Sequence, residues 1–187
     1  MPYYQKRGKI PQKRHIQFIK TNGELFAEEL VSTEGFSSIY SNKYHCYQPT
    51  EVLSIEEPYS VEPEAAVDKN TQHRAFSGFD IKSEVDYLKS RKIVLFNDDV
   101  YLSLAAPRKS MKDYFYKNSQ ADEMVFVHEG SGLLHSVYGQ LTFKKGDHII
   151  IPKGTVHQLH FNYENNRLFI TESFHTLNFP KRYMNKL

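Results

Sequence analysis

The chain has 187 residues, of which 40% are hydrophobic and 25% are charged, and its formal net charge is +2. This length allows one domain with a sizeable core, or one domain and an arm, and so small a charge does not by itself indicate a nucleic-acid partner. No apolar run approaches the ~18 residues of a membrane span, the N-terminus lacks the apolar core of a signal peptide, and the single cysteine, Cys46, excludes an internal disulfide framework and fits a reducing cytoplasm.

Residues 1–55 predict a basic arm followed by a β-hairpin. The basic side chains near the N-terminus are Lys6, Arg7, Lys9, Lys13, Arg14 and Lys20. They allow an anion- or nucleic-acid-binding arm, or an extended segment that lies over a neighbouring domain or subunit. We favour the second interpretation because no recognised nucleic-acid module accompanies these residues. Residues 23–40 predict a hairpin that turns at Glu34-Gly35, and Pro49 ends any continuing central strand.

The next part of the chain combines a loop, a short helix and a second hairpin. Acidic residues and prolines between residues 58 and 68 indicate a surface loop. Residues 83–90 predict a helix that Ser83 caps at its N-terminus. Residues 91–96 and 100–105 predict the two strands of a β-hairpin.

The segment from residue 122 to residue 161 determines the predicted fold class. Its strands are short, evenly spaced and separated by glycine-containing turns, and they cover residues 123–128, 133–137, 141–144, 147–151 and 156–161. A last strand is predicted at residues 168–173. This pattern is typical of an antiparallel sandwich or small barrel. We therefore predict a β-barrel domain over residues 56–177, with residues 178–187 as a connector.

The spacing within this segment resembles the two sequence motifs of the cupin family of jelly-roll barrels. The residues that carry the resemblance are Glu123, Gly130, Gly146, Pro152, Gly154 and His157. It implies a mainly β, cupin-like jelly-roll β-sandwich or barrel, here with an N-terminal β arm and one or two short helices. In metal-binding cupins the first motif also carries His-x-His before the Glu, and three His and one Glu hold the metal. Here the second of those His would fall on Ser119 or Asn118, and neither is a strong ligand.

Glu123 and His157 are the two candidate metal ligands that this chain retains. Because alternate residues of a strand share a face, each is predicted to point into the barrel with its apolar neighbours. One interpretation is a residual metal pair, and the other is a Glu and a His that hydrogen-bond to each other or to neighbours. Two ligands make a poor Fe(II) site, because such dioxygenases usually use a triad. A third ligand would have to come from Tyr116, His135 or His148.

An ordered set of short motifs also runs through nearly the whole chain. The set comprises Gly8-Lys9-Ile10-Pro11, Arg14-His15-x-Gln17-Phe18, Glu28-Glu29-Leu30-Val31, Glu34-Gly35-Phe36, Tyr44-His45, Pro49-Thr50, Asn97-x-Asp99-Val100, Asp113-Tyr114-Phe115-Tyr116-x-Asn118, Asp122-Glu123, Phe126-Val127-His128-Glu129-Gly130, Gly146-Asp147, Ile151-Pro152-x-Gly154-Thr155, Glu172-Ser173 and Phe179-Pro180-x-Arg182-Tyr183. Taken in this order, the motifs resemble homogentisate 1,2-dioxygenase, an enzyme family of tyrosine and phenylalanine catabolism.

The resemblance implies a two-part, cupin-like oxidoreductase in the cytoplasm that uses Fe(II) and O2 to cleave the homogentisate ring to maleylacetoacetate. It also implies a homo-oligomer, either a trimer or a dimer of trimers (a hexamer). The matching motifs belong to the family's N-terminal half, whose barrel does not hold the iron. The iron-binding His and Glu residues and the proposed acid/base His belong to the C-terminal half. No catalytic or cofactor-binding residue is therefore assigned to this chain.

Three functional hypotheses follow. The leading one is the N-terminal half of a homogentisate dioxygenase, inactive alone, whose partner is the C-terminal catalytic half and which presents an apolar surface to it. The second is a stand-alone, non-enzymatic cupin that binds a small ligand or serves as an assembly module. The third is a minimal metal-dependent cupin enzyme that uses Glu123, His157 and a third ligand. None of the three involves a nucleic acid or a membrane.

Overall fold

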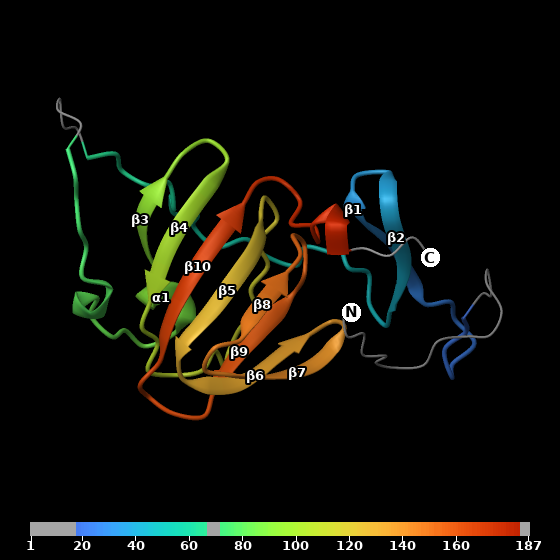
Figure 1. Cartoon of the computed structure of the whole chain (residues 1–187). Coiled ribbons are helices and arrows are strands. Elements are labelled where there is room, and N and C mark those ends of the chain that lie inside the picture. The colour runs from blue at the N-terminus through green and yellow to red at the C-terminus, as the bar shows by residue number, and fades with distance from the viewer. Residues whose placement is uncertain (1–17, 67–71, 184–187) are drawn as a thin grey trace. The chain divides into compact units, whose positions relative to one another are not determined.

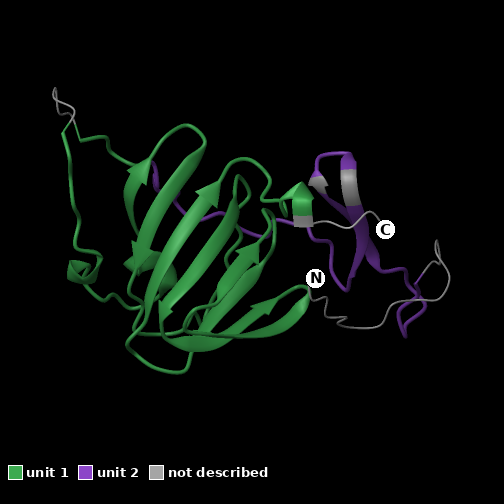
Figure 2. Cartoon of the chain, in the orientation of Figure 1, with its two compact units in different colours: residues 1–8, 63–187 green, residues 9–62 purple. Residues whose placement is uncertain are grey.

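The computed structural model describes residues 18–66 and 72–183 (Figure 1). The predicted basic arm, apart from Lys20, and the family motifs before Phe18 therefore lie outside the described residues. The chain divides into two compact units, one formed by Lys9–Glu62 and one formed by Pro63–Leu187 together with Met1–Gly8 (Figure 2).

The smaller unit contains the predicted hairpin. Strands β1 (Ala27–Glu34) and β2 (Ser37–His45) pair antiparallel, from Ala27 opposite His45 to Glu34 opposite Ser37. Gly35 turns the chain with a φ of 59°, a left-handed conformation that glycine adopts without steric cost. Near the open end of the hairpin, the Nε2 atom of His45 lies 2.8 Å from the Glu29 carboxylate. His45 therefore has a structural partner within its own hairpin.

The larger unit consists of two antiparallel sheets. A five-stranded sheet has the order β3-β4-β10-β5-β8, and a three-stranded sheet has the order β7-β6-β9 (Figure 1). The strands are β3 (Lys92–Phe96), β4 (Val100–Ala105), β5 (Asp122–Glu129), β6 (Ser131–Ser136), β7 (Gly139–Lys144), β8 (His148–Ile151), β9 (His157–Phe161) and β10 (Arg167–Ser173). The last strand, β10, lies between β4 and β5, so neighbours in space are distant in sequence, as in jelly rolls. The predicted mainly β, cupin-like jelly roll is confirmed.

Alternation along the strands produces the core of this unit. Along most of β5, β8 and β10 every second residue is buried, and the residues between them are partly or fully exposed. The strands contribute Val125, Val127, Leu134, Phe143, Ile149, Ile151, Leu159, Leu168 and Ile170 to the core, and Tyr87 and Met111 are fully buried with them. The two sheets therefore enclose one apolar interior, with side chains from both.

The helical part of the unit is shorter than the sequence predicts. Helix α1 (Tyr87–Ser90) has four residues, and its N-cap is Asp86, whose carboxylate accepts a hydrogen bond from the Lys89 amide at 3.0 Å. The predicted helix from Ser83 was wrong because Glu84 instead forms a β-bridge with Pro107. Two 3₁₀ turns complete the set, η1 (Gly78–Asp80) and η2 (Lys181–Tyr183). No helix within residues 18–66 and 72–183 is long and apolar enough to cross a membrane.

Candidate functional site

Two carboxylates enter the barrel interior side by side. Glu123 on β5 and Glu172 on β10 are directly opposite in the antiparallel pairing, so both side chains lie on the same face. That face also carries Val125 and Ile170, which are fully buried. Like charges at such a cross-strand pair repel each other. The pair therefore needs a compensating cation.

Arg91 supplies that cation. It follows helix α1 and precedes strand β3, and its Nη1 atom donates a hydrogen bond to Glu123 Oε1 at 2.7 Å. Its Nη2 atom forms an ion pair with Glu172 Oε2, also at 2.7 Å. The side chains of Arg91, Glu123 and Glu172 are 10%, 0% and 13% exposed, so all three charges are largely removed from water. The guanidinium also lies 5.7 Å from the ring centre of Tyr87, within cation–π range.

Two neutral donors complete the cluster. Tyr116 Oη donates to Glu123 Oε1 at 3.3 Å, and Asn118 Nδ2 is 3.2 Å from the same oxygen and 2.8 Å from Glu172 Oε1. The Asn118 side-chain oxygen accepts from the amides of Gln120 and Ala121, which fixes the loop before β5. We call these five residues, Arg91, Tyr116, Asn118, Glu123 and Glu172, the arginine cluster.

Burial and charge shift the pKa values of three groups within the arginine cluster. Burial raises the pKa of the Glu172 carboxyl, and the nearby Arg91 charge opposes that shift without cancelling it. Burial together with the Glu123 charge raises the pKa of the Tyr116 hydroxyl, so Tyr116 remains a donor at neutral pH. Burial acts to lower the pKa of Arg91, but its interactions with Tyr87, Glu123 and Glu172 outweigh burial and raise that pKa.

His157, the other predicted candidate, is fully buried at the start of β9. Its Nδ1 atom lies 2.9 Å from the carbonyl oxygen of Thr155, which can only accept, so Nδ1 carries the proton. Tyr116 connects the two candidates, because its backbone pairs with that of His157 and their rings lie 5.4 Å apart. Within the described part of the chain, His157 Nε2 and Glu123 Oε2 have no hydrogen-bond partner.

These residues do not fit Fe(II). The Glu123 carboxylate is already bound to the Arg91 cation, and a divalent ion beside a guanidinium would be repelled. The predicted third ligands His135 and His148 face away from the interior, since they alternate with the buried Leu134 and Ile149. No group of three or more His, Cys, Asp or Glu residues among residues 18–66 and 72–183 could hold a metal ion. An iron triad is therefore not assembled by the described side chains of this barrel.

The arginine cluster was largely missed at the level of sequence. Glu123 and Tyr116 were candidates for metal binding, whereas Arg91 was predicted only as the first residue of a strand. One signal was available in the predicted strand 168–173, where Leu168, Ile170 and Glu172 share a face. A carboxylate on a buried face requires a cation or a proton.

An antiparallel jelly roll with these motif positions defines a cupin-like protein. No family model matches the chain. A protein of Saccharolobus solfataricus named "Putative dioxygenase" is 33% identical over 186 residues, which cover 100% of this chain and 48% of the relative. The chain thus spans about half the length of the curated relative that it matches, and it is a cupin-like protein with a dioxygenase-named relative.

Solved cupin structures also resemble this chain. A cupin-2 domain containing protein from Shewanella frigidimarina is 21% identical, with a TM-score of 0.39 over 45% of this chain and 79% of its own. An RmlC-like cupin from the same organism is 17% identical, with a TM-score of 0.43 over 55% of this chain and 91% of its own. The fold assignment itself rests on the strand order and register of this chain.

Proposed function

We propose that this chain forms one barrel of a two-part, Fe(II)-dependent dioxygenase that cleaves the ring of homogentisate in the cytoplasm. The proposal is supported by similarity along the full chain to a relative named as a dioxygenase, and by the ordered motifs that resemble homogentisate dioxygenase. The relative is about twice as long as the aligned region, which leaves room for a second half. Homo-oligomers, trimeric or hexameric, are part of the same proposal.

The observation that supports iron binding by the second half, and not by this barrel, is the Arg91 cation inside the barrel. Because it pairs with Glu123 and Glu172 at 2.7 Å each, a fixed positive charge lies directly beside the carboxylate that a cupin metal would use. Iron would then be held by the second half. This barrel would contribute a rigid wall, contacts between subunits and exclusion of water from the reacting centre.

The experiment is to measure iron content and homogentisate-dependent O2 uptake of the purified 187-residue chain, supplied with Fe(II) and ascorbate. We expect no stoichiometric iron and no uptake from the chain alone. Uptake should appear when the uncovered half of the Saccharolobus relative is co-expressed with the chain. Turnover by the chain alone, lost in Glu123→Gln, would reject the proposal in favour of a metal site in this barrel.

A stand-alone, non-enzymatic cupin is the second candidate function. It is favoured by the arginine cluster itself, because the charges of the cluster pair with one another inside the barrel and need no ligand or second half. The same co-expression distinguishes the two candidates. Assembly with the second half, accompanied by O2 uptake, supports the dioxygenase, whereas a chain that stays alone and inactive supports the stand-alone module.

A further inference from the structure

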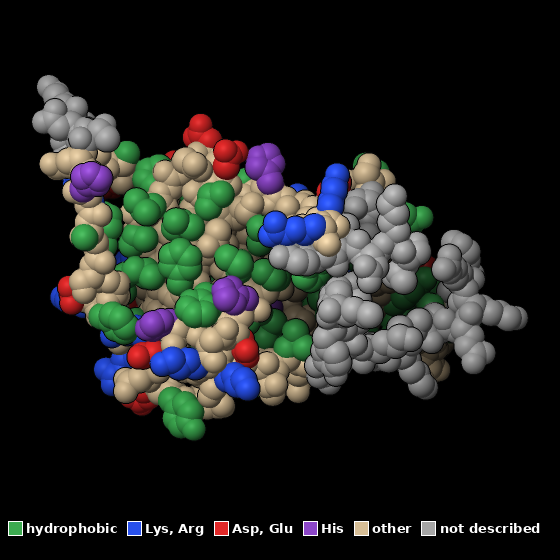
Figure 3. All heavy atoms as spheres, in the orientation of Figure 1, with side chains coloured by type: hydrophobic (Ala, Val, Ile, Leu, Met, Phe, Trp, Pro, Cys, Tyr) green, Lys and Arg blue, Asp and Glu red, His purple; other side chains and the backbone are tan. Residues whose placement is uncertain are grey.

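The five-stranded sheet is apolar on its outer face as well as on its inner one. The outward residues of its strands alternate with the buried core residues, and the apolar ones are Leu95, Leu102, Leu104, Met124, Phe126, Ile150 and Phe169. Figure 3 shows apolar side chains across this sheet. We call these seven residues the outer apolar face.

An antiparallel sheet at a protein surface usually has one apolar and one polar face. Here Leu95 and Ile150, on the two edge strands, are 52% and 48% exposed although both side chains are apolar. Contiguous apolar patches of this kind mark interaction sites. We therefore expect a sheet with two apolar faces to be covered on both sides in the functional protein.

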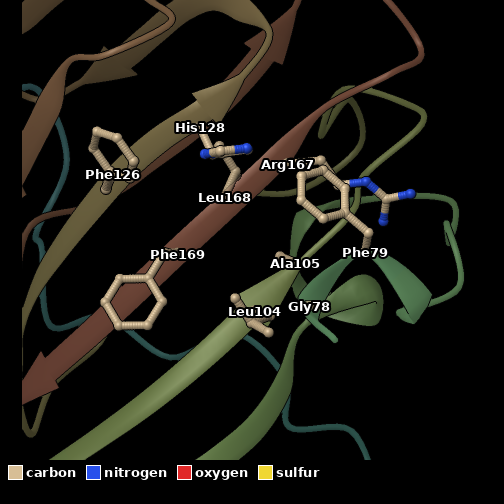
Figure 4. A pocket seen from close by; sticks show the side chains of 9 residues that line it. All are labelled: Gly78, Phe79, Leu104, Ala105, Phe126, His128, Arg167, Leu168 and Phe169. Carbon is tan, nitrogen blue, oxygen red and sulfur yellow. The ribbon is translucent and has the colours of Figure 1, made fainter. Parts of the chain in front are cut away.

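A pocket of about 290 Å³ opens on this face (Figure 4). Phe79, Leu104, Phe126 and Phe169 supply apolar walls, and Arg167 stands beside Phe79 with its guanidinium carbon 5.9 Å from the ring centre. Arg167 is held in place because Nη1 donates to the carbonyl of Ile81 at 2.8 Å. The pocket can receive an apolar side chain, and its rim presents a fixed positive charge.

Two side chains of the face are permanently cationic. Register places Lys92 beside Leu104, and Arg167 lines the pocket. Two copies of this chain packed face to face would bring these like-signed groups together. A partner with carboxylates around an apolar centre would complement them.

We propose that the outer apolar face docks a second β-barrel, the counterpart of the half of the Saccharolobus relative that this chain does not cover. The inference rests on the proposed function for the existence of that half. Two observations support it: the relative extends for about as much length again beyond the match, and the face is apolar on a sheet already buried on its other side.

The test uses the uncovered half of the Saccharolobus relative as a tagged probe, co-expressed with the 187-residue chain. Two quantities are measured: the mass of the purified complex and the affinity of the two polypeptides for each other. Ile150→Lys places a charge within the outer apolar face. Val137→Lys is the matched control, because Val137 is 44% exposed, close to the 48% of Ile150, and lies in the β6–β7 turn of the other sheet. Thermal unfolding confirms that both variants are folded.

We expect a one-to-one complex that Ile150→Lys weakens at least about tenfold and that Val137→Lys leaves unchanged. Equal binding by both variants overturns the docking site, whatever the activity. Absence of any complex overturns it. A wild-type dimer of this chain that Ile150→Lys dissociates overturns it in favour of a second copy. A complex that depends on Ile150 but takes up no O2 with homogentisate and Fe(II) upholds docking and rejects the proposed function.

Discussion

At the scale of single residues, Arg91 determines the chemistry of the barrel interior. It is the cation between two carboxylates that the β5–β10 register places side by side. A neutral side chain there would leave Glu123 and Glu172 buried without a counter-charge, and both would have to take up protons or draw in water. Arg91 is therefore a structural centre of the unit.

Replacing Arg91 with Met should destabilise the protein by about 3–5 kcal/mol, the usual cost of breaking a buried ion pair. Urea unfolding of wild type and Arg91→Met measures this difference. Arg108→Met is the matched control, because Arg108 pairs with Glu164 at 3.1 Å on the surface, where both side chains are more than half exposed. The control should change stability by less than about 1 kcal/mol. Equal losses in both variants would contradict the role assigned to Arg91.

The pKa of Glu172 makes a prediction about pH. Because burial raises this pKa above its ordinary value of 4.5, the folded state binds a proton more readily than the unfolded state does. Glu172 therefore lowers stability as pH rises through and above that value, and its contribution is most favourable in acid. Glu172→Gln removes this dependence. As pH rises from 4 to 7, the free energy of unfolding should therefore fall less steeply, or rise more, in Glu172→Gln than in wild type. Parallel plots of unfolding free energy against pH for the two proteins would exclude the effect.

At the scale of elements, the approach of β6 to its neighbours depends on one glycine. An added Cβ at Gly132 would overlap the carbonyl oxygen of His160 on β9 and press on the Phe143 ring on β7. Backbone cannot move aside as a flexible side chain can. Gly132 therefore sets how closely the three strands of this sheet pack.

Gly132→Ala should cost about 3 kcal/mol or more, at the upper end of the range for overpacking. Gly146→Ala is the control, because Gly146 has a φ of 91° and open space around it, so only backbone strain of about 1–2 kcal/mol is expected. Chemical denaturation of the two variants compares them directly. A larger loss for Gly146→Ala would show that strain rather than close packing governs this sheet.

The elements themselves were well predicted where alternation and glycine turns coincide. The strand expected at residues 123–128 is β5 (Asp122–Glu129), and the one expected at 168–173 is β10 (Arg167–Ser173). Helix α1 was predicted too long because the backbone of Glu84 hydrogen-bonds to Ala106 and Arg108, a pairing distant in sequence. The local helix propensity of a segment gives no information about such long-range pairings.

The same limit separates what was and was not predicted of the site. Alternation correctly placed Glu123 and His157 in the interior, where both are fully buried. The partner of Glu123 is Arg91, which lies 32 residues away along the chain. No strand pattern in the sequence indicates that the Arg91 side chain points inward. Spacing motifs report which backbone positions face inward, whereas the pairing of charges across the barrel depends on the three-dimensional path of the connecting segments. Whether Glu123 and His157 bind metal stays a prediction.

At the scale of the whole molecule, two features of the larger unit support one division of roles. The buried carboxylates of its interior pair with Arg91 of the same unit, and its outer apolar face is suited to a partner barrel. Both agree with the length of the Saccharolobus relative, of which this chain matches 48%. In this account the barrel provides structure and docking, and the second half provides iron and turnover.

The measurement that tests this account most directly is thermal unfolding of the 187-residue chain, under anaerobic conditions, with and without excess Fe(II). A metal that binds the folded state raises the unfolding temperature by mass action. We expect no change in that temperature, because the Arg91 cation already pairs with Glu123. A rise in unfolding temperature with Fe(II) that disappears in Glu123→Gln and His157→Ala would contradict it and place a metal site inside this barrel.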